Sequence, residues 1–152
     1  MHVILVYTPS PVAPTLTISL TRLANNRLYY FPPVGTTLSF ESANTFCKDH
    51  GMHLVTINSN AENTLIYAQL VLLGLDVAPG TWLGYRDVTG AGTYKWVQPK
   101  VGPTPTFFRN NPTPTQCAAY LDGNPTASWV TRPCNTQRAF VCELEPPCSL
   151  VL

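Results

Sequence analysis

Two stretches of the chain carry apolar residues at helical spacing, and each begins with a serine that can cap a helix. The first predicted helix starts after Ser39 and ends at Gly51. Its apolar face consists of Phe40, Ala43, Phe46 and Cys47. The second is predicted over residues 60–73, with Ser59 as its cap and Gly74 as its stop.

The rest of the pattern predicts short strands. Apolar and polar residues alternate from 15 to 20, which is typical of a half-buried strand. Runs rich in aromatic and branched residues predict further strands at 27–31, 52–57, 81–83 and 93–96.

Residues 1–26 as a whole are predicted to form an extended arm, because prolines at 9, 11 and 14 favour polyproline-like backbone. The arm is a linker or tail, an added strand, or a contact with a neighbouring subunit. The apolar run at 2–7 is too short for a secretory signal. No stretch approaches the length of a membrane span, so membrane insertion is not expected.

Residues 98–115 contain five prolines and few apolar residues apart from Phe107 and Phe108. This composition predicts an irregular surface loop.

Length and charge narrow the possible functions. A chain of 152 residues is close to the usual size of one domain. Its net charge is +1 and 11% of its residues are charged, so no basic surface for nucleic acid is expected.

The chain has 5 cysteines, and the wide spacing of four of them favours disulfides in an oxidising compartment. Several pairings are open on these grounds. A structural zinc site is not expected, because no two cysteines lie two to four residues apart.

Cysteines and tryptophans together form a distinctive frame: Cys47, Trp82-Leu83-Gly84-Tyr85, Trp96, Cys117, Trp129, Cys134 and Cys142. From about Tyr29 to Glu143 this frame resembles the C-type lectin-like domain, with Trp82–Tyr85 at the place of that family's Trp-Ile-Gly-Leu strand. The resemblance implies an α+β fold, in which two helices flank small antiparallel sheets and a long loop extends from them. It also implies the disulfides Cys47–Cys142 and Cys117–Cys134, and it places Trp82 and Trp96 in the core. The expected division is an arm at 1–26, the lectin-like domain at 27–144 and a tail at 145–152.

Calcium-dependent members of the family hold the ion with acids and amides of the long loop and of the strand that follows it. The positions that resemble those ligands are Asn111, Thr113, Gln116 and Thr131, and none is a carboxylate. Calcium requires six to eight oxygen ligands, several of them charged. We therefore expect no metal and no cofactor.

Cys148 lies outside the frame. It is either a free terminal thiol, half of an interchain disulfide, or bonded to a small thiol or to a partner elsewhere.

These features predict a calcium-independent recognition or assembly module, extracellular or at the cell surface, that binds protein or glycan through its long-loop surface. Assembly would use residues 1–26 and Cys148. The alternative is a true lectin that binds sugar by aromatic stacking and direct hydrogen bonds. No catalytic site is expected, because Cys47 belongs to the frame and the acids are scattered. The candidate ligand-binding residues are Tyr85, Tyr94, Phe107, Phe108, Arg109, Asn110, Asn111, Thr113, Gln116 and Trp129.

Overall fold

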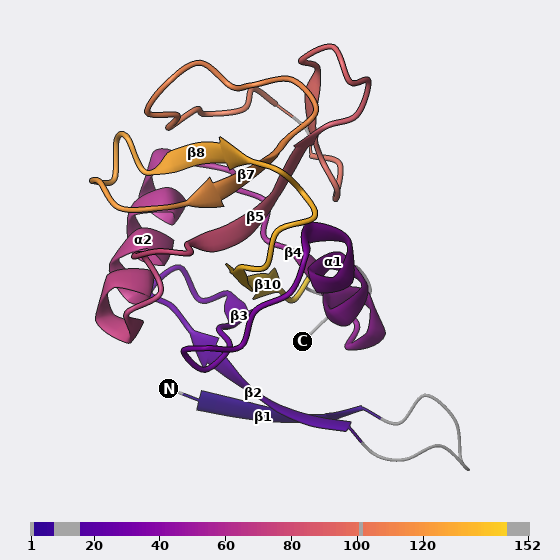
Figure 1. Ribbon diagram of the computed structural model, residues 1–152. Helices are drawn as coiled ribbons and strands as arrows, with labels where there is room; N and C mark the ends of the chain where they lie inside the picture. The colour runs from indigo at the N-terminus through magenta and orange to yellow at the C-terminus, as the bar shows by residue number, and fades with distance from the viewer. Residues whose placement is uncertain (1, 8–15, 101, 146–152) are drawn as a thin grey trace.

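The structure is a computed structural model that describes residues 2–7, 16–100 and 102–145. Within them the chain forms two helices and two sheets (Figure 1). In chain order the elements are β1 (His2–Tyr7), β2 (Leu16–Arg22), β3 (Leu28–Tyr30), α1 (Phe40–Asp49), β4 (His53–Leu54), α2 (Asn60–Leu73), β5 (Thr81–Asp87), β6 (Tyr94–Trp96), β7 (Cys117–Tyr120), β8 (Trp129–Arg132), β9 (Ala139–Phe140) and β10 (Cys142–Glu143). The first sheet has the order β1-β2-β3-β10-β4, and the second has the order β6-β5-β7-β8 with β9 beside β5.

Both predicted helix starts are confirmed. The Ser39 hydroxyl accepts a hydrogen bond from the Ser42 N–H at 3.3 Å, and the Ser59 hydroxyl accepts one from the Glu62 N–H at 3.1 Å. Helix α2 ends at Gly74, whose φ of 73° is easily reached only without a side chain.

The amino-terminal strands join the sheet of the same chain. The predicted strand at 15–20 is present as β2, which pairs with β1 on one side and with β3 on the other. Leu20 on β2 is fully buried in the core. A domain boundary at residue 26 stays a prediction, and residues 8–15 of the predicted arm lie outside the described residues.

The two disulfides implied by the family resemblance are confirmed. Cys47–Cys142 joins α1 to β10, across 95 positions of sequence. Cys117–Cys134 joins the start of β7 to the segment after β8, across 17 positions. Each sheet is thus linked covalently to another segment of the chain, the first sheet to α1 and the second to the segment after β8. Cys148 lies outside the described residues.

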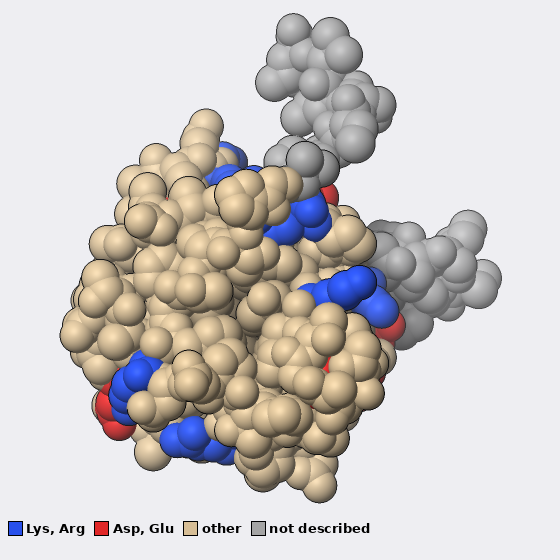
Figure 2. All heavy atoms as spheres, turned by 90° about the horizontal axis from the view of Figure 1, so that it is seen from above, with Lys and Arg blue, Asp and Glu red and all other residues tan. Residues whose placement is uncertain are grey.

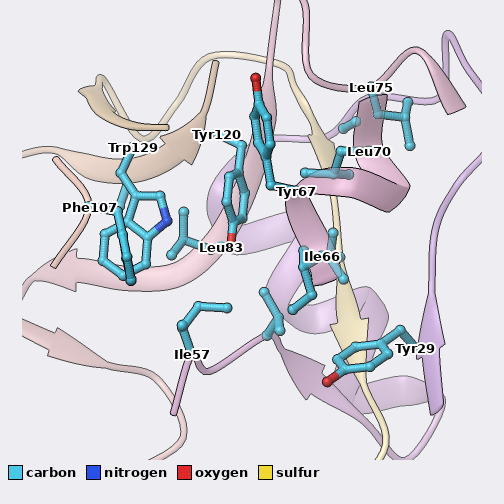
Figure 3. Close-up of a cluster of buried hydrophobic side chains, with 14 of the residues drawn as sticks. Tyr29, Ile57, Ile66, Tyr67, Leu70, Leu75, Leu83, Phe107, Tyr120 and Trp129 are labelled. Carbon is cyan, nitrogen blue, oxygen red and sulfur yellow. The ribbon is translucent and has the colours of Figure 1, made fainter. Parts of the chain in front are cut away.

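The core is built around aromatic and branched side chains from both sheets and both helices. Trp82 and Trp96 are buried, as expected. Figure 3 shows the part of the core beneath the long loop, where Trp129 lies beside Phe107 and Tyr120. The loop therefore packs on this cluster through Phe107.

The long loop between β6 and β7 lies at one end of the molecule. Figure 1 shows it at the top, while the β1–β2 hairpin lies at the bottom. A ligand bound at the loop would therefore be well separated from the hairpin.

Candidate functional site

The long loop is fastened to β8 by the backbone. The Trp129 N–H donates to the Phe107 carbonyl at 2.9 Å, and the Arg109 N–H donates to the Trp129 carbonyl at 2.9 Å. These bonds give residues 107–109 a short parallel pairing with β8. The middle of the loop thereby has a fixed position despite its irregular sequence.

Asn63 on α2 holds the same region from inside. Its side-chain oxygen accepts hydrogen bonds from the Tyr120 hydroxyl at 2.7 Å and from the Trp129 indole N–H at 3.0 Å. Its amide nitrogen donates to the Pro125 carbonyl at 2.7 Å. Because Asn63 is fully buried, these bonds satisfy polar groups that water cannot reach. No local sequence pattern marks this residue, because its partners come from distant strands.

Asp87 fastens the end of the loop. Its carboxylate accepts hydrogen bonds from four backbone N–H groups, those of Thr115, Gly92, Thr89 and Gly90, at 2.7 to 3.1 Å. These bonds, that of Thr115 above all, lower the pKa of Asp87 to about 2. The carboxylate joins the turn after β5 to the chain just before β7, which sequence reasoning did not predict.

The positions that resemble calcium ligands do not fit the ion. The Thr131 hydroxyl accepts from the Thr113 N–H at 3.1 Å, and the Thr113 carbonyl accepts from the Tyr94 hydroxyl at 2.5 Å. Neutral groups thus bond to one another where calcium would need charged oxygens. Within residues 2–7, 16–100 and 102–145, no group of three or more His, Cys, Asp or Glu side chains is placed to hold a metal ion.

An open hollow of about 430 Å³ lies between the loop and β5–β6. Its lining combines aromatic rings with amide groups: Tyr85, Gly92, Tyr94, Thr106, Phe108, Arg109, Asn110, Asn111 and Pro112. The rings of Tyr85, Tyr94 and Phe108 lie within 6.1 Å of one another and form one wall. The exposed amides of Asn110 and Asn111 supply donors and acceptors at the rim.

The structure thus brings together six of the predicted ligand-binding residues at the hollow and places the others away from it. Trp129 is 0% exposed and Phe107 is 8% exposed, so both rings are used in the core and neither offers a face for stacking. Arg109 lines the hollow, but its guanidinium is tied to the Leu121 carbonyl. Thr113 and Gln116 are not part of the lining.

The surface around the loop carries few acidic groups. Figure 2 views the molecule from this end and shows a mostly uncharged face, with Lys and Arg at its margins and Asp and Glu at few points.

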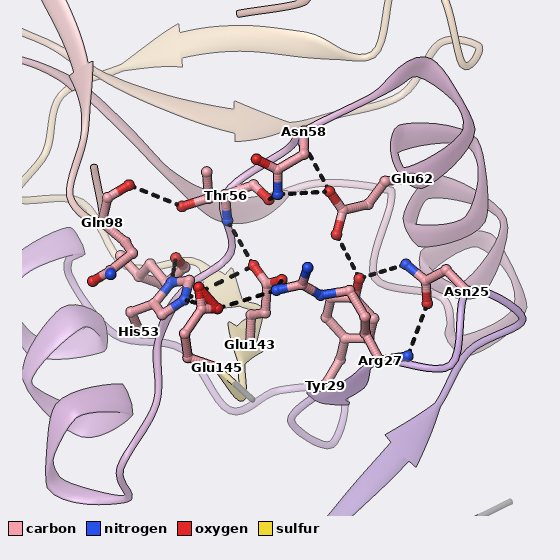
Figure 4. A network of polar contacts seen from close by, with 11 residues as sticks. Asn25, Arg27, Tyr29, His53, Thr56, Asn58, Glu62, Gln98, Glu143 and Glu145 are labelled. Carbon is pink, nitrogen blue, oxygen red and sulfur yellow. Dashed lines mark hydrogen bonds and ion pairs between the residues drawn. The ribbon is translucent and has the colours of Figure 1, made fainter. Parts of the chain in front are cut away.

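A cluster of buried polar side chains lies between the first sheet and α2. Figure 4 shows Glu143 of β10 between Arg27 and Thr56, with Glu62 of α2 close by. Glu143 pairs with the Arg27 guanidinium and accepts from the Thr56 N–H at 3.2 Å. Burial, reinforced by the charge of Glu62, raises the pKa of Glu143 to about 7. Glu62 accepts from the Tyr29 hydroxyl at 2.6 Å, so this cluster joins the first sheet to α2.

Comparison with known proteins establishes the family. A family model described as "Lectin C-type domain" matches residues 36–144. The human secretory phospholipase A2 receptor is 31% identical over 126 residues, which are 77% of this chain and 8% of the receptor. Among solved structures, the carbohydrate-recognition domain of the mouse scavenger receptor C-type lectin gives a TM-score of 0.65 at 24% identity, covering 85% of this chain and 98% of that one. A calcium-independent type II antifreeze protein gives 0.63 at 21% identity, covering 91% and 95%.

The chain therefore belongs to the C-type lectin domain family. Domains of this family are binding modules without enzymatic activity, which agrees with the prediction that the chain is not an enzyme. The chain spans a small part of the receptors that it matches. In the part of the chain that the structure describes, each helix is too short or too polar to cross a membrane.

Proposed function

We propose that the domain recognises a glycan outside the cell, without calcium, in the hollow between the long loop and β5–β6. The observation that carries this proposal is the lining itself, in which Tyr94 and Phe108 stand beside the amides of Asn110 and Asn111. Of the two predicted functions, it favours the lectin that acts by stacking and direct hydrogen bonds.

A sugar ring offers one apolar face of C–H groups and a periphery of hydroxyls. The apolar face can lie against an aromatic ring, and the hydroxyls can exchange hydrogen bonds with side-chain amides, which both donate and accept. The hollow supplies both kinds of group within a volume suited to a small ligand. The relatives support a glycan, because one solved neighbour is described as a carbohydrate-recognition domain.

Independence from calcium rests on the hydrogen bonds that hold the loop. Asp87 and the Tyr94–Thr113–Thr131 chain of bonds fix it with protein groups alone. A further neighbour of the same fold is described as calcium-independent, which supports the proposal. An extracellular location is supported by the two disulfides and by relatives that are receptors.

Binding measurements on variants of the hollow test this function. Tyr94→Ala removes the ring and should weaken binding of a neutral glycan ligand about tenfold, whereas Tyr94→Phe keeps the ring, loses only the hydroxyl bond to the Thr113 carbonyl and should weaken binding less. Asn110→Ala and Asn111→Ala should each weaken binding, while Asn135→Ala, at an exposed position outside the hollow, should not. Equal affinity of Tyr94→Ala and the unchanged protein would place the glycan elsewhere.

Recognition of a protein and assembly through residues 1–26 and Cys148 stay predictions. The pairing of β2 with β3 supports a structural role for residues 16–22, as a strand of the domain's own first sheet.

A further inference from the structure

A second hollow, of about 320 Å³, adjoins the same two tyrosines. It is lined by Tyr85, Tyr94, Lys95, Trp96, Pro99, Lys100, Gly102 and Thr104. Tyr85 and Tyr94, whose ring centroids lie 5.5 Å apart, thus form a wall that both hollows share. A ligand of more than one sugar unit can therefore reach both hollows across these two residues.

The second hollow gathers positive charge, and none of the acids in the described part of the chain lines it. Lysine occurs in the chain at positions 48, 95 and 100 only, and two of these residues line this hollow. Among the described residues none of the lysines forms an ion pair.

The position of Lys100 is fixed by its own turn. Its ammonium donates to the Pro103 carbonyl at 2.7 Å, which uses one of three N–H groups and leaves two for a ligand. Lys95 is exposed on β6 at the edge of the second sheet. No acidic residue lines either hollow within the described part of the chain. Asp87 pairs with Tyr94 in strand register, but its carboxylate already accepts hydrogen bonds from backbone N–H groups.

The uncharged part of the second hollow is also suited to a saccharide. The Trp96 indole N–H donates to the Thr104 hydroxyl at 3.1 Å, which ties the far wall to β6. Aromatic faces and Pro99 provide apolar surface beside the two cations. A small inorganic anion would use the cations and leave this apolar surface uncovered, whereas a charged sugar would use both.

We infer that the second hollow binds the anionic group, sulfate or carboxylate, of a glycan whose neighbouring sugar occupies the first hollow. This inference rests on the proposed function and names the class of glycan: an acidic oligosaccharide. Lys100 and Lys95 supply the charge, and the Tyr85–Tyr94 wall aligns the two units.

The test uses the full chain and three tetrasaccharide probes that share the same sugar backbone and differ in their charged groups. The first is a sulfated heparin-derived tetrasaccharide, the second is its desulfated and N-acetylated form, which keeps the carboxylates, and the third is desulfated, N-acetylated and carboxyl-reduced, hence neutral. Titration calorimetry should show the sulfated probe binding about tenfold more tightly than the neutral one at low salt, with the difference shrinking at about 0.5 M salt because exposed charges are screened. The desulfated probe distinguishes sulfate from carboxylate as the anionic group.

Lysine variants locate the contact. Lys100→Gln and Lys95→Gln should each weaken binding of the preferred acidic probe about three- to tenfold and leave the neutral probe unaffected, since each removes one charge-assisted contact. Lys48→Gln, at an exposed position on α1, should match the unchanged protein.

Two results would overturn the inference while leaving glycan recognition intact. One is equal binding of all three probes, and the other is a preference for acidic probes that Lys95→Gln and Lys100→Gln do not reduce. Lysine-dependent binding of an acidic peptide in preference to every saccharide would overturn the saccharide class. Failure of every glycan to bind would instead refute the proposed function itself.

Discussion

The carboxylate of Asp87 lies 2.7 Å from the backbone N–H of Thr115 and so joins the turn after β5 to the end of the long loop. The same carboxylate accepts from three more N–H groups in that turn. One anionic side chain therefore gathers two segments at the base of the candidate site.

The Asp87 contacts should make the domain sensitive to acid in a defined window. The pKa of this carboxyl falls from 3.8 to about 2 because the backbone N–H groups favour the charged form. A lowered pKa stabilises the folded state above pH 3.8, and that contribution disappears as the pH falls toward 2. Asp87→Asn should lower the melting temperature at neutral pH and flatten the acid transition, as followed by thermal melts from pH 5 to pH 2.

Asp122→Asn is the matched control, because the Asp122 side chain makes no hydrogen bond within the described residues. Parallel stability curves for Asp87→Asn and the unchanged protein would contradict the role of Asp87.

Asn63→Leu should destabilise the domain strongly. The variant leaves the Tyr120 hydroxyl and the Trp129 indole N–H buried without an acceptor, at about 2 to 4 kcal/mol in total. Denaturant unfolding measures this loss. Asn44→Leu provides a matched control, because Asn44 is also buried but its side-chain oxygen has no hydrogen-bond partner. Equal losses in the two variants would show that Asn63 acts through its volume alone.

Buried Glu143 should give an opposite pH dependence at higher pH. Its pKa is raised from 4.5 to about 7, so between these values the folded state keeps a proton that the unfolded state has lost. The free energy of unfolding should therefore decrease as the pH rises from 4.5 to 7, by an amount on the order of 2 kcal/mol.

Glu143→Gln removes the titrating group and should remove this part of the slope. Urea unfolding of both proteins at pH 5 and pH 8 measures it. A pH slope that is the same in the two proteins would show that Glu143 stays charged throughout.

The two disulfides should differ in their contribution to stability. Replacing both Cys117 and Cys134 by Ala should lower the free energy of unfolding by about 3 kcal/mol. Replacing both Cys47 and Cys142 by Ala should lower it by about 4 to 5 kcal/mol, because Cys47–Cys142 closes the longer loop. Denaturant unfolding of the two double variants gives the order. A larger loss for the Cys117–Cys134 pair would contradict the loop-length explanation.

Local patterns predicted much of the fold. Ser39 and Ser59 identify helix starts because capping depends on residues within one turn. The alternation at 15–20 predicted β2, but the partner strand β1 was missed, because its sequence is apolar throughout after His2 and has no period of two.

The candidate site was predicted less completely, because exposure and long-range contacts are not local properties. Trp129 and Tyr94 are both aromatic, yet the first is buried and the second lines both hollows. Asn63 has a polar side chain on a helix, and only the fold brings Tyr120 and Trp129 to it. Lys100 falls within the loop predicted at 98–115, but its place beside Tyr94 depends on the path of that loop.

A glycan array probed in millimolar calcium and again with a chelator tests the central claim most directly. We predict that the same glycans bind in both conditions, because Asp87, Tyr94 and Thr131 hold the long loop without a metal. Tyr94→Ala should reduce the bound signals equally in both. Glycan binding that appears with calcium and disappears with the chelator would contradict the account.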